Sequence, residues 1–103
     1  MKTKIQKLLE KNGFEVEKTS DGWEIAQYTP AGEDWRLYFD KLVDIVSYAD
    51  NFDEEEEFNM WVDAKRAGVS GVPSHAELWQ DQLWKKNTLN DVADTIRLKG
   101  YTE

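Results

Sequence analysis

Residues 14–39 read FEVEKTSDGWEIAQYTPAGEDWRLYF, and this stretch decides the fold class of the chain. Apolar and polar residues alternate in it over three short runs, which is the pattern of strands with one buried and one exposed face. Turn-forming residues separate these runs, at 19–22 and again at 29–34. Because short turns join antiparallel neighbours, the stretch predicts a three-stranded antiparallel sheet that is covered on one face only.

On both sides of this stretch the period of the apolar residues changes from two to 3.6, as in amphipathic helices. One helix is expected before the strands, between Thr3 and Asn12, and four are expected after them. Their expected positions are around 42–49, from Asp53 to Gly68, from Ser74 through Trp84, and from Asn87 or Thr88 to Gly100. The prediction is therefore a single α+β domain over residues 1–103, with the order αβββαααα and a sheet covered on one face by about five helices.

The amino-acid composition excludes several classes of function. The chain has no Cys and one His, which excludes disulfides, thiolate nucleophiles and the usual Cys/His zinc sites. No stretch approaches the roughly 18 apolar residues of a membrane helix, and residues 1–11 are too charged for a signal peptide. We therefore expect a cytoplasmic protein with no membrane partner.

Negative charge is concentrated in the middle of the chain. Residues 21–63 carry thirteen acidic and two basic residues, a net charge of −11, whereas the whole chain carries −8. Such a segment is repelled by nucleic acid and attracted to basic protein surfaces. We expect a basic nucleic-acid-binding protein as partner and no direct contact with nucleic acid.

The densest part of this segment is the run DNFDEEEE at residues 50–57. Acidic residues favour the first turn of a helix, so a solvated helix start is one explanation. Four consecutive glutamates exceed what a helix start needs, so the second explanation is that the carboxylates imitate the phosphates of DNA. The candidate partner-binding charges are Asp44, Asp50, Asp53, Glu54, Glu55, Glu56, Glu57 and Asp63.

Metal binding and catalysis find little support in the sequence. An EF-hand loop needs Gly at its sixth position, but counting from Asp50 or Asp53 gives Glu55 or Phe58. His75 is adjacent to Ser74, and neighbours at i, i+1 on a helix do not face each other, so no Ser–His pair follows. We expect no enzyme activity, no catalytic residue, no metal and no cofactor.

Two tryptophans of the region after Ser74 are further candidates for partner contact. Trp79 and Trp84 are five residues apart, which separates them by about 140° around a helix. Either this helix is wedged between two layers, or one Trp is exposed and anchors a partner.

Four segments carry a resemblance to a known family: 28–35 (YTPAGEDW), 48–53 (YADNFD), 60–64 (MWVDA) and 68–74 (GVSGVPS). With these segments, residues 14–95 resemble small acidic proteins of phages and conjugative elements of gut bacteria. The resemblance implies an antagonist of host defence, either an anti-CRISPR protein directed at an RNA-guided type II nuclease or an antirestriction protein. It implies no particular inhibitory residue.

Together these observations predict an acidic, non-enzymatic inhibitor that acts as a DNA mimic on a CRISPR-associated nuclease or a restriction enzyme. The alternative is an accessory protein-interaction domain of the mobile element. Such a domain would bind one of the element's own proteins through the open sheet face or through Trp79 and Trp84.

Overall fold

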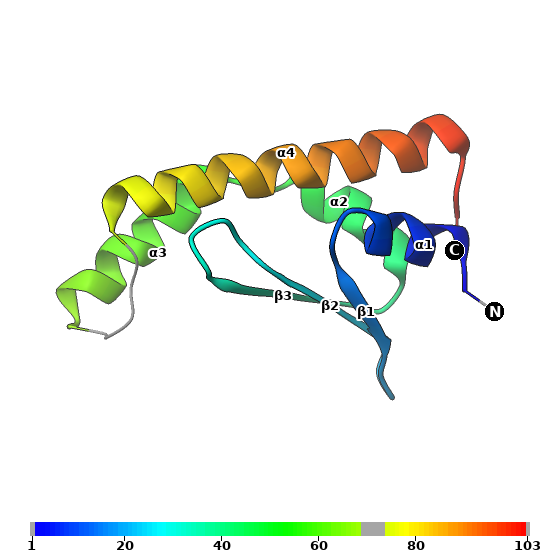
Figure 1. Cartoon of the computed structure of the whole chain (residues 1–103), viewed down its shortest axis with the longest axis horizontal. Coiled ribbons are helices and arrows are strands. Elements are labelled where there is room, and N and C mark those ends of the chain that lie inside the picture. The colour runs from blue at the N-terminus through cyan, green and yellow to red at the C-terminus, as the bar shows by residue number, and fades with distance from the viewer. Residues whose placement is uncertain (1, 69–73, 103) are drawn as a thin grey trace.

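Within the residues that the computed structural model describes, 2–68 and 74–102, the chain forms three strands and four α-helices (Figure 1). The expected α+β class and the three-stranded antiparallel sheet are confirmed. In chain order the elements are α1 (Lys4–Lys11), β1 (Glu15–Lys18), β2 (Trp23–Tyr28), β3 (Asp34–Phe39), a 3-10 turn η1 (Leu42–Asp44), α2 (Ile45–Asp50), α3 (Glu54–Arg66) and α4 (His75–Lys99).

The sheet has the order β1-β2-β3, and its register separates the apolar from the polar side chains. Val16 pairs with Ile25, and Ile25 pairs with Leu37, so these three share the inner face. Glu17, Glu24 and Tyr38 form the matching row on the outer face. Figure 1 shows α1, α2 and α4 on one side of the strands, as the alternation predicted.

Gly22 closes the turn between β1 and β2 for a steric reason. A Cβ atom at this position would lie 2.3 Å from the carbonyl oxygen of Phe39, and the φ angle of Gly22 is 152°. Only glycine fits such a close approach of two backbones.

The apolar core lies between the sheet and three helices. Four of its residues come from the C-terminal half of α4, and the others come from α1, the sheet, η1, α2 and Phe14 just before β1. The fully buried core side chains of high volume are Ile5, Leu9, Ile25, Leu42, Ile45, Leu89 and Val92.

The two last predicted helices form one continuous helix, α4, of 25 residues. The sequence contains neither Gly nor Pro between Ser74 and Gly100, so nothing interrupts the helical hydrogen bonds at Asn87 or Thr88. Helix-capping residue types at those positions lie inside the helix instead. At about 1.5 Å per residue, α4 runs for most of the 44 Å long axis of the molecule.

Helix α3 projects from this body and packs against the N-terminal half of α4 (Figure 1). Phe58 and Val62, on its apolar side, are only half-buried. The predicted loop at 69–73 lies outside the described residues. In the described chain, α3 and the first three turns of α4 therefore form an arm with few buried apolar residues, which we call the α3 arm.

Candidate partner-binding surface

The part of the acidic run from Asp53 to Glu57 forms the N-cap and the first turn of α3, and two of its carboxylates have structural roles. Asp53 caps the helix and accepts hydrogen bonds from the backbone N–H groups of Glu55 at 2.9 Å and Glu56 at 3.4 Å. Glu54 is half-buried and accepts a hydrogen bond from Lys86 Nζ of α4 at 2.9 Å, which lowers the pKa of this carboxyl. These two residues fix the start of α3 and tie it to α4.

The next carboxylates of α3 have no such role. Glu55 and Glu56 are exposed, and neither forms an ion pair in the part of the chain that the structure describes. Asp63 is exposed as well, and it follows Glu56 by seven residues, which places both on the same side of the helix. The exposed side of α3 thus carries negative charge along two turns.

Glu57 faces the junction between the α3 arm and the body. Burial raises the pKa of the Tyr48 hydroxyl, and the nearby charge of Glu57 raises it further. The ring of Tyr48 packs edge-on against Phe39, with 5.8 Å between the ring centroids. Glu57 is half-buried there, so it is less accessible than its two neighbours.

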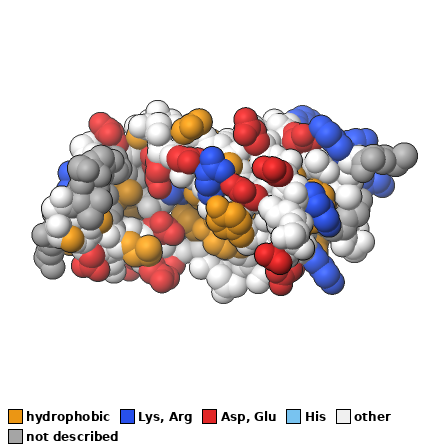
Figure 2. All heavy atoms as spheres, turned by 90° about the horizontal axis from the view of Figure 1, so that it is seen from below, with side chains coloured by type: hydrophobic (Ala, Val, Ile, Leu, Met, Phe, Trp, Pro, Cys, Tyr) orange, Lys and Arg blue, Asp and Glu red, His pale blue; other side chains and the backbone are white. Residues whose placement is uncertain are grey.

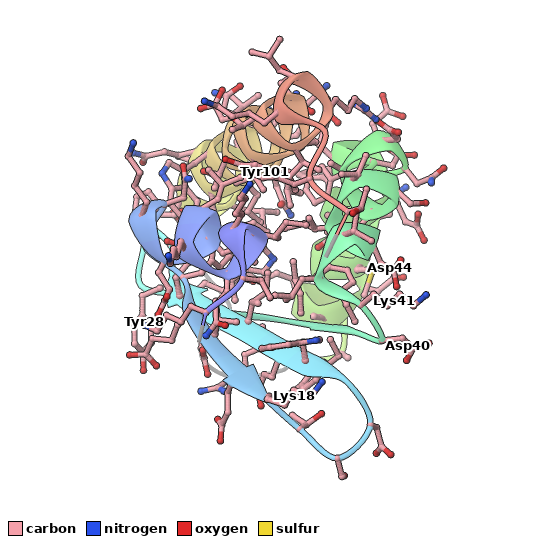
Figure 3. All side chains as sticks on the ribbon, turned by 90° about the vertical axis from the view of Figure 1, so that its right-hand side faces the viewer. Lys18, Tyr28, Asp40, Lys41, Asp44 and Tyr101 are labelled. Atoms are coloured by element: carbon pink, nitrogen blue, oxygen red, sulfur yellow. The ribbon has the colours of Figure 1, made fainter. Side chains whose placement is uncertain are left out.

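Around α2, the remaining predicted charges have partners within the chain. Asp50 pairs with Arg97 of α4, and hydrogen bonding to Asp50 raises the pKa of the guanidinium. Asp44 accepts a hydrogen bond from the backbone N–H of Lys41 at 3.2 Å. Figure 3 shows Lys41 and Asp44 at the turn between β3 and α2, some distance from Tyr28 on the sheet.

The acidic residues therefore fall into two groups, those with partners within the chain and those that remain exposed. Asp50, Asp53 and Glu54 serve the fold, whereas Glu55, Glu56 and Asp63 remain exposed on α3. Seen from below, most of the visible Lys and Arg side chains gather at the end formed by α1 and the C-terminal end of α4, and most Asp and Glu side chains lie elsewhere (Figure 2). On this face, basic and acidic side chains are therefore unevenly distributed along the long axis.

The two candidate tryptophans have different environments. Trp84 is half-buried against the core, with its ring 5.8 Å from that of Trp35 in an edge-on contact. Trp79 packs on Phe58 of α3 at 5.5 Å between ring centroids and keeps 41% of its surface exposed. Trp79 is thus the one of the two that is available to a partner.

A buried polar network that the sequence analysis missed holds the N-terminal half of α4 to the β2–β3 loop. Asp81 has 0% exposure and accepts hydrogen bonds from Thr29 Oγ1 at 2.6 Å and from the Ala31 N–H at 3.1 Å. Lys85, 2% exposed, donates to Glu33 Oε1 at 3.1 Å and lies 5.5 Å from the ring centroid of Trp35. The loop is therefore fixed to α4 through charged groups, not through apolar packing.

One signal in the sequence could have revealed this network. Leu78, Gln82, Lys85, Leu89, Val92 and Ile96 follow one another at spacings of three or four. Polar residues at 82 and 85, with Asp81 beside them, interrupt an otherwise apolar stripe. A buried stripe that contains opposite charges indicates polar partners in another segment.

Neither metal sites, nor membrane-spanning helices, nor similarity to known proteins indicate a further function for the described residues. Among the described residues, no three acidic or His side chains converge in a way that could hold a metal ion. No helix in the described ranges is long and apolar enough to cross a membrane. The chain matches no protein-family profile, no curated protein and no solved structure.

Proposed function

We propose that this protein is an acidic, non-enzymatic inhibitor that binds the basic nucleic-acid-binding surface of a host defence nuclease. The observation that carries the proposal is the row of exposed carboxylates on α3, formed by Glu55, Glu56 and Asp63. A helix that serves only the fold needs a cap and one or two acidic residues, and Asp53 and Glu54 already fill those roles.

These carboxylates present several negative charges to a surface that normally grips DNA. Duplex DNA presents one phosphate charge per roughly 1.7 Å of its axis, and proteins meet it with arrays of Lys and Arg. Glu55 and Glu56 are separated by one residue rise, about 1.5 Å, and Asp63 follows about 10 Å further along α3. A basic groove can therefore contact several charges of α3 at once.

A nuclease guided by RNA is a suitable target on chemical grounds. Such enzymes read a short DNA motif with arginines and hold the heteroduplex in a positively charged channel. Restriction enzymes also bind DNA phosphates through basic side chains. The acidic α3 arm would occupy either surface before the nucleic acid does.

The proposal is tested by plasmid cleavage with a panel of type II CRISPR nucleases and restriction enzymes. The protein is added either before or after the nuclease is loaded with its nucleic acid. We expect inhibition of at least one nuclease, and only when the protein is added first, because both ligands then compete for the same basic surface. Complete cleavage across the panel, or inhibition that is independent of the order of addition, would contradict the proposal.

A second candidate function is an interaction domain that binds another protein of a mobile element. It is favoured by the open outer face of the sheet, where Tyr28 and Tyr38 are 72% and 68% exposed, and by Trp79. The change Trp79→Ala separates the two candidates, because Trp79 lies apart from the core, whereas Trp84 packs against it. The interaction domain predicts that binding is lost in this variant, and the inhibitor predicts that inhibition is nearly unchanged.

A further inference from the structure

A pocket of about 280 Å³ lies between α1 and the C-terminal end of α4, at the end of the molecule opposite to the α3 arm. Its lining among the described residues consists of Lys4, Lys7, Leu8, Lys11, Thr95, Lys99 and Tyr101, and of these seven residues four are lysines and none is acidic. In a chain with 21 acidic and 13 basic residues, such a lining is opposite in sign to the molecule as a whole.

The fold brings these lysines together from both ends of the sequence. Gly100 ends α4 with a φ angle of 68°, in the left-handed region that glycine adopts without strain. The chain then turns back, and the N–H of Tyr101 donates to the Ile96 carbonyl at 3.1 Å. Figure 3 shows Tyr101 between α1 and the end of α4.

Tyr101 forms one wall of the pocket and is held in place by packing. Its ring packs against the apolar core and is half-buried, and Lys4 Nζ lies 5.6 Å from the ring centroid. The aliphatic stem of a lysine can lie along such a surface while its ammonium stays in water. The pocket is thus backed by the apolar core.

The dipoles of α1 and α4 explain only some of the lysines in this pocket. Lys11 and Lys99 lie in the last turns of α1 and α4, where the helix dipole favours cations. Lys4 and Lys7 lie in the first half of α1, whose first turn has no acidic residue, and there the dipole disfavours cations. In the described chain, Lys7, Lys11 and Lys99 form no ion pair, so their mutual repulsion is not offset by a carboxylate.

We propose that this pocket binds a small molecule that carries a polyphosphate group. Lysine ammonium groups bind phosphate oxygens as point charges, whereas recognition of a planar carboxylate commonly uses the fork of an arginine, and no arginine is among the described lining residues. Lys7, Lys11 and Lys99 match a ligand with several negative charges, and a pocket of this volume suits a small ligand. The site lies apart from the carboxylates of α3, so the proposal does not depend on the proposed inhibition.

The test is a calorimetric titration of the full-length protein with inorganic pyrophosphate, with chloride at the same ionic strength as the reference. We expect saturable binding of one pyrophosphate per chain. The variant Lys7→Gln/Lys11→Gln should weaken it by about tenfold or more, since each ammonium donates a charged hydrogen bond. The control Lys18→Gln/Lys41→Gln removes the same charge from exposed lysines outside the pocket and should weaken binding by less than about twofold.

All four substituted lysines are exposed, so both variants should unfold at nearly the wild-type temperature, which thermal unfolding checks. Binding that does not saturate, or an equal loss in both variants, would overturn the proposal, because either result reflects overall charge. A single-stranded oligonucleotide that binds more tightly than pyrophosphate and loses affinity in Lys7→Gln/Lys11→Gln would also overturn it. That result would make the pocket a nucleic-acid contact.

Discussion

The two halves of α4 are parts of one helix but lie in contrasting surroundings. The C-terminal half buries Leu89, Val92, Ala93 and Ile96 in the core that α1, α2 and the sheet complete. The N-terminal half buries Leu78 together with the polar Asp81, Gln82 and Lys85, and it supports α3, in which Phe58 and Val62 are only half-buried. Apolar packing therefore dominates at one end of the molecule, whereas buried polar contacts add to a smaller set of apolar contacts at the other.

Because of this difference, the residues that stabilise the fold and the residues that carry surface charge lie in different parts of the molecule. The described residues of α3 contribute little to the core, so they can carry charge that would be costly inside the protein. The body supplies the stability and holds α4 in place. Substitutions in the two halves should consequently differ in their effects on folding and on binding.

The largest expected effect on folding comes from removing an apolar side chain of the body. Ile96→Ala should lower the free energy of unfolding by about 2–5 kcal/mol, because the side chain is buried in the core and leaves a cavity. Leu83→Ala on the same helix should change it by less than about 0.5 kcal/mol, because Leu83 is 55% exposed. Urea unfolding of both variants checks this, and similar losses in the two would contradict the division of α4.

A smaller loss is expected in the polar network. Asp81→Ala should cost about 1–3 kcal/mol, because the Thr29 hydroxyl and the Ala31 N–H lose their buried acceptor. Thr29→Val, which removes the hydroxyl but keeps the shape, should cost less. If the network acts as a unit, the double variant will lose clearly less than the sum of the two single losses. Additive losses would instead show that Asp81 and Thr29 act independently.

The smallest effect concerns the junction at Tyr48. Because the folded state raises the pKa of Tyr48, its contribution to stability is complete below the unfolded value of about 10 and is lost as the pH rises through the folded value. Unfolding measured from pH 8 to 11 should therefore show a decline that is weaker in Tyr48→Phe. Glu57→Gln should weaken the decline in part, since burial is the larger cause. An identical pH dependence in all three proteins would contradict this reading.

The structural elements that depend on local patterns of residues could be predicted from the sequence. The alternation in residues 14–39 is sufficient for the sheet and its covered face, and Asp53 caps α3 where the capping pattern placed it. The continuity of α4 was missed because Asn87 and Thr88 are capping residue types that a helix also tolerates in its interior.

Contacts between residues that are far apart in the sequence could not be predicted from local patterns. Asp81 and Thr29 are 52 residues apart, as are Lys85 and Glu33, and no local rule connects them. The ion pair of Glu54 with Lys86 likewise depends on how α3 docks on α4. The acidic run was visible in the sequence, but the division between its structural and its exposed members required the fold.

The central claim is that the exposed carboxylates of α3 bind a basic nucleic-acid-binding surface. It is tested most directly with two double variants of equal charge, Glu55→Gln/Glu56→Gln in α3 and Glu15→Gln/Glu17→Gln on the outer face of β1. All four residues are exposed, so both variants should fold normally. The measurement is the protein concentration that halves cleavage by an inhibited nuclease, at low and at physiological salt. We predict that the α3 variant needs about five- to tenfold more protein, with a weaker salt dependence, and that the β1 variant needs less than about twofold more. Equal losses in the two variants, or a larger loss in the β1 variant, would contradict the claim.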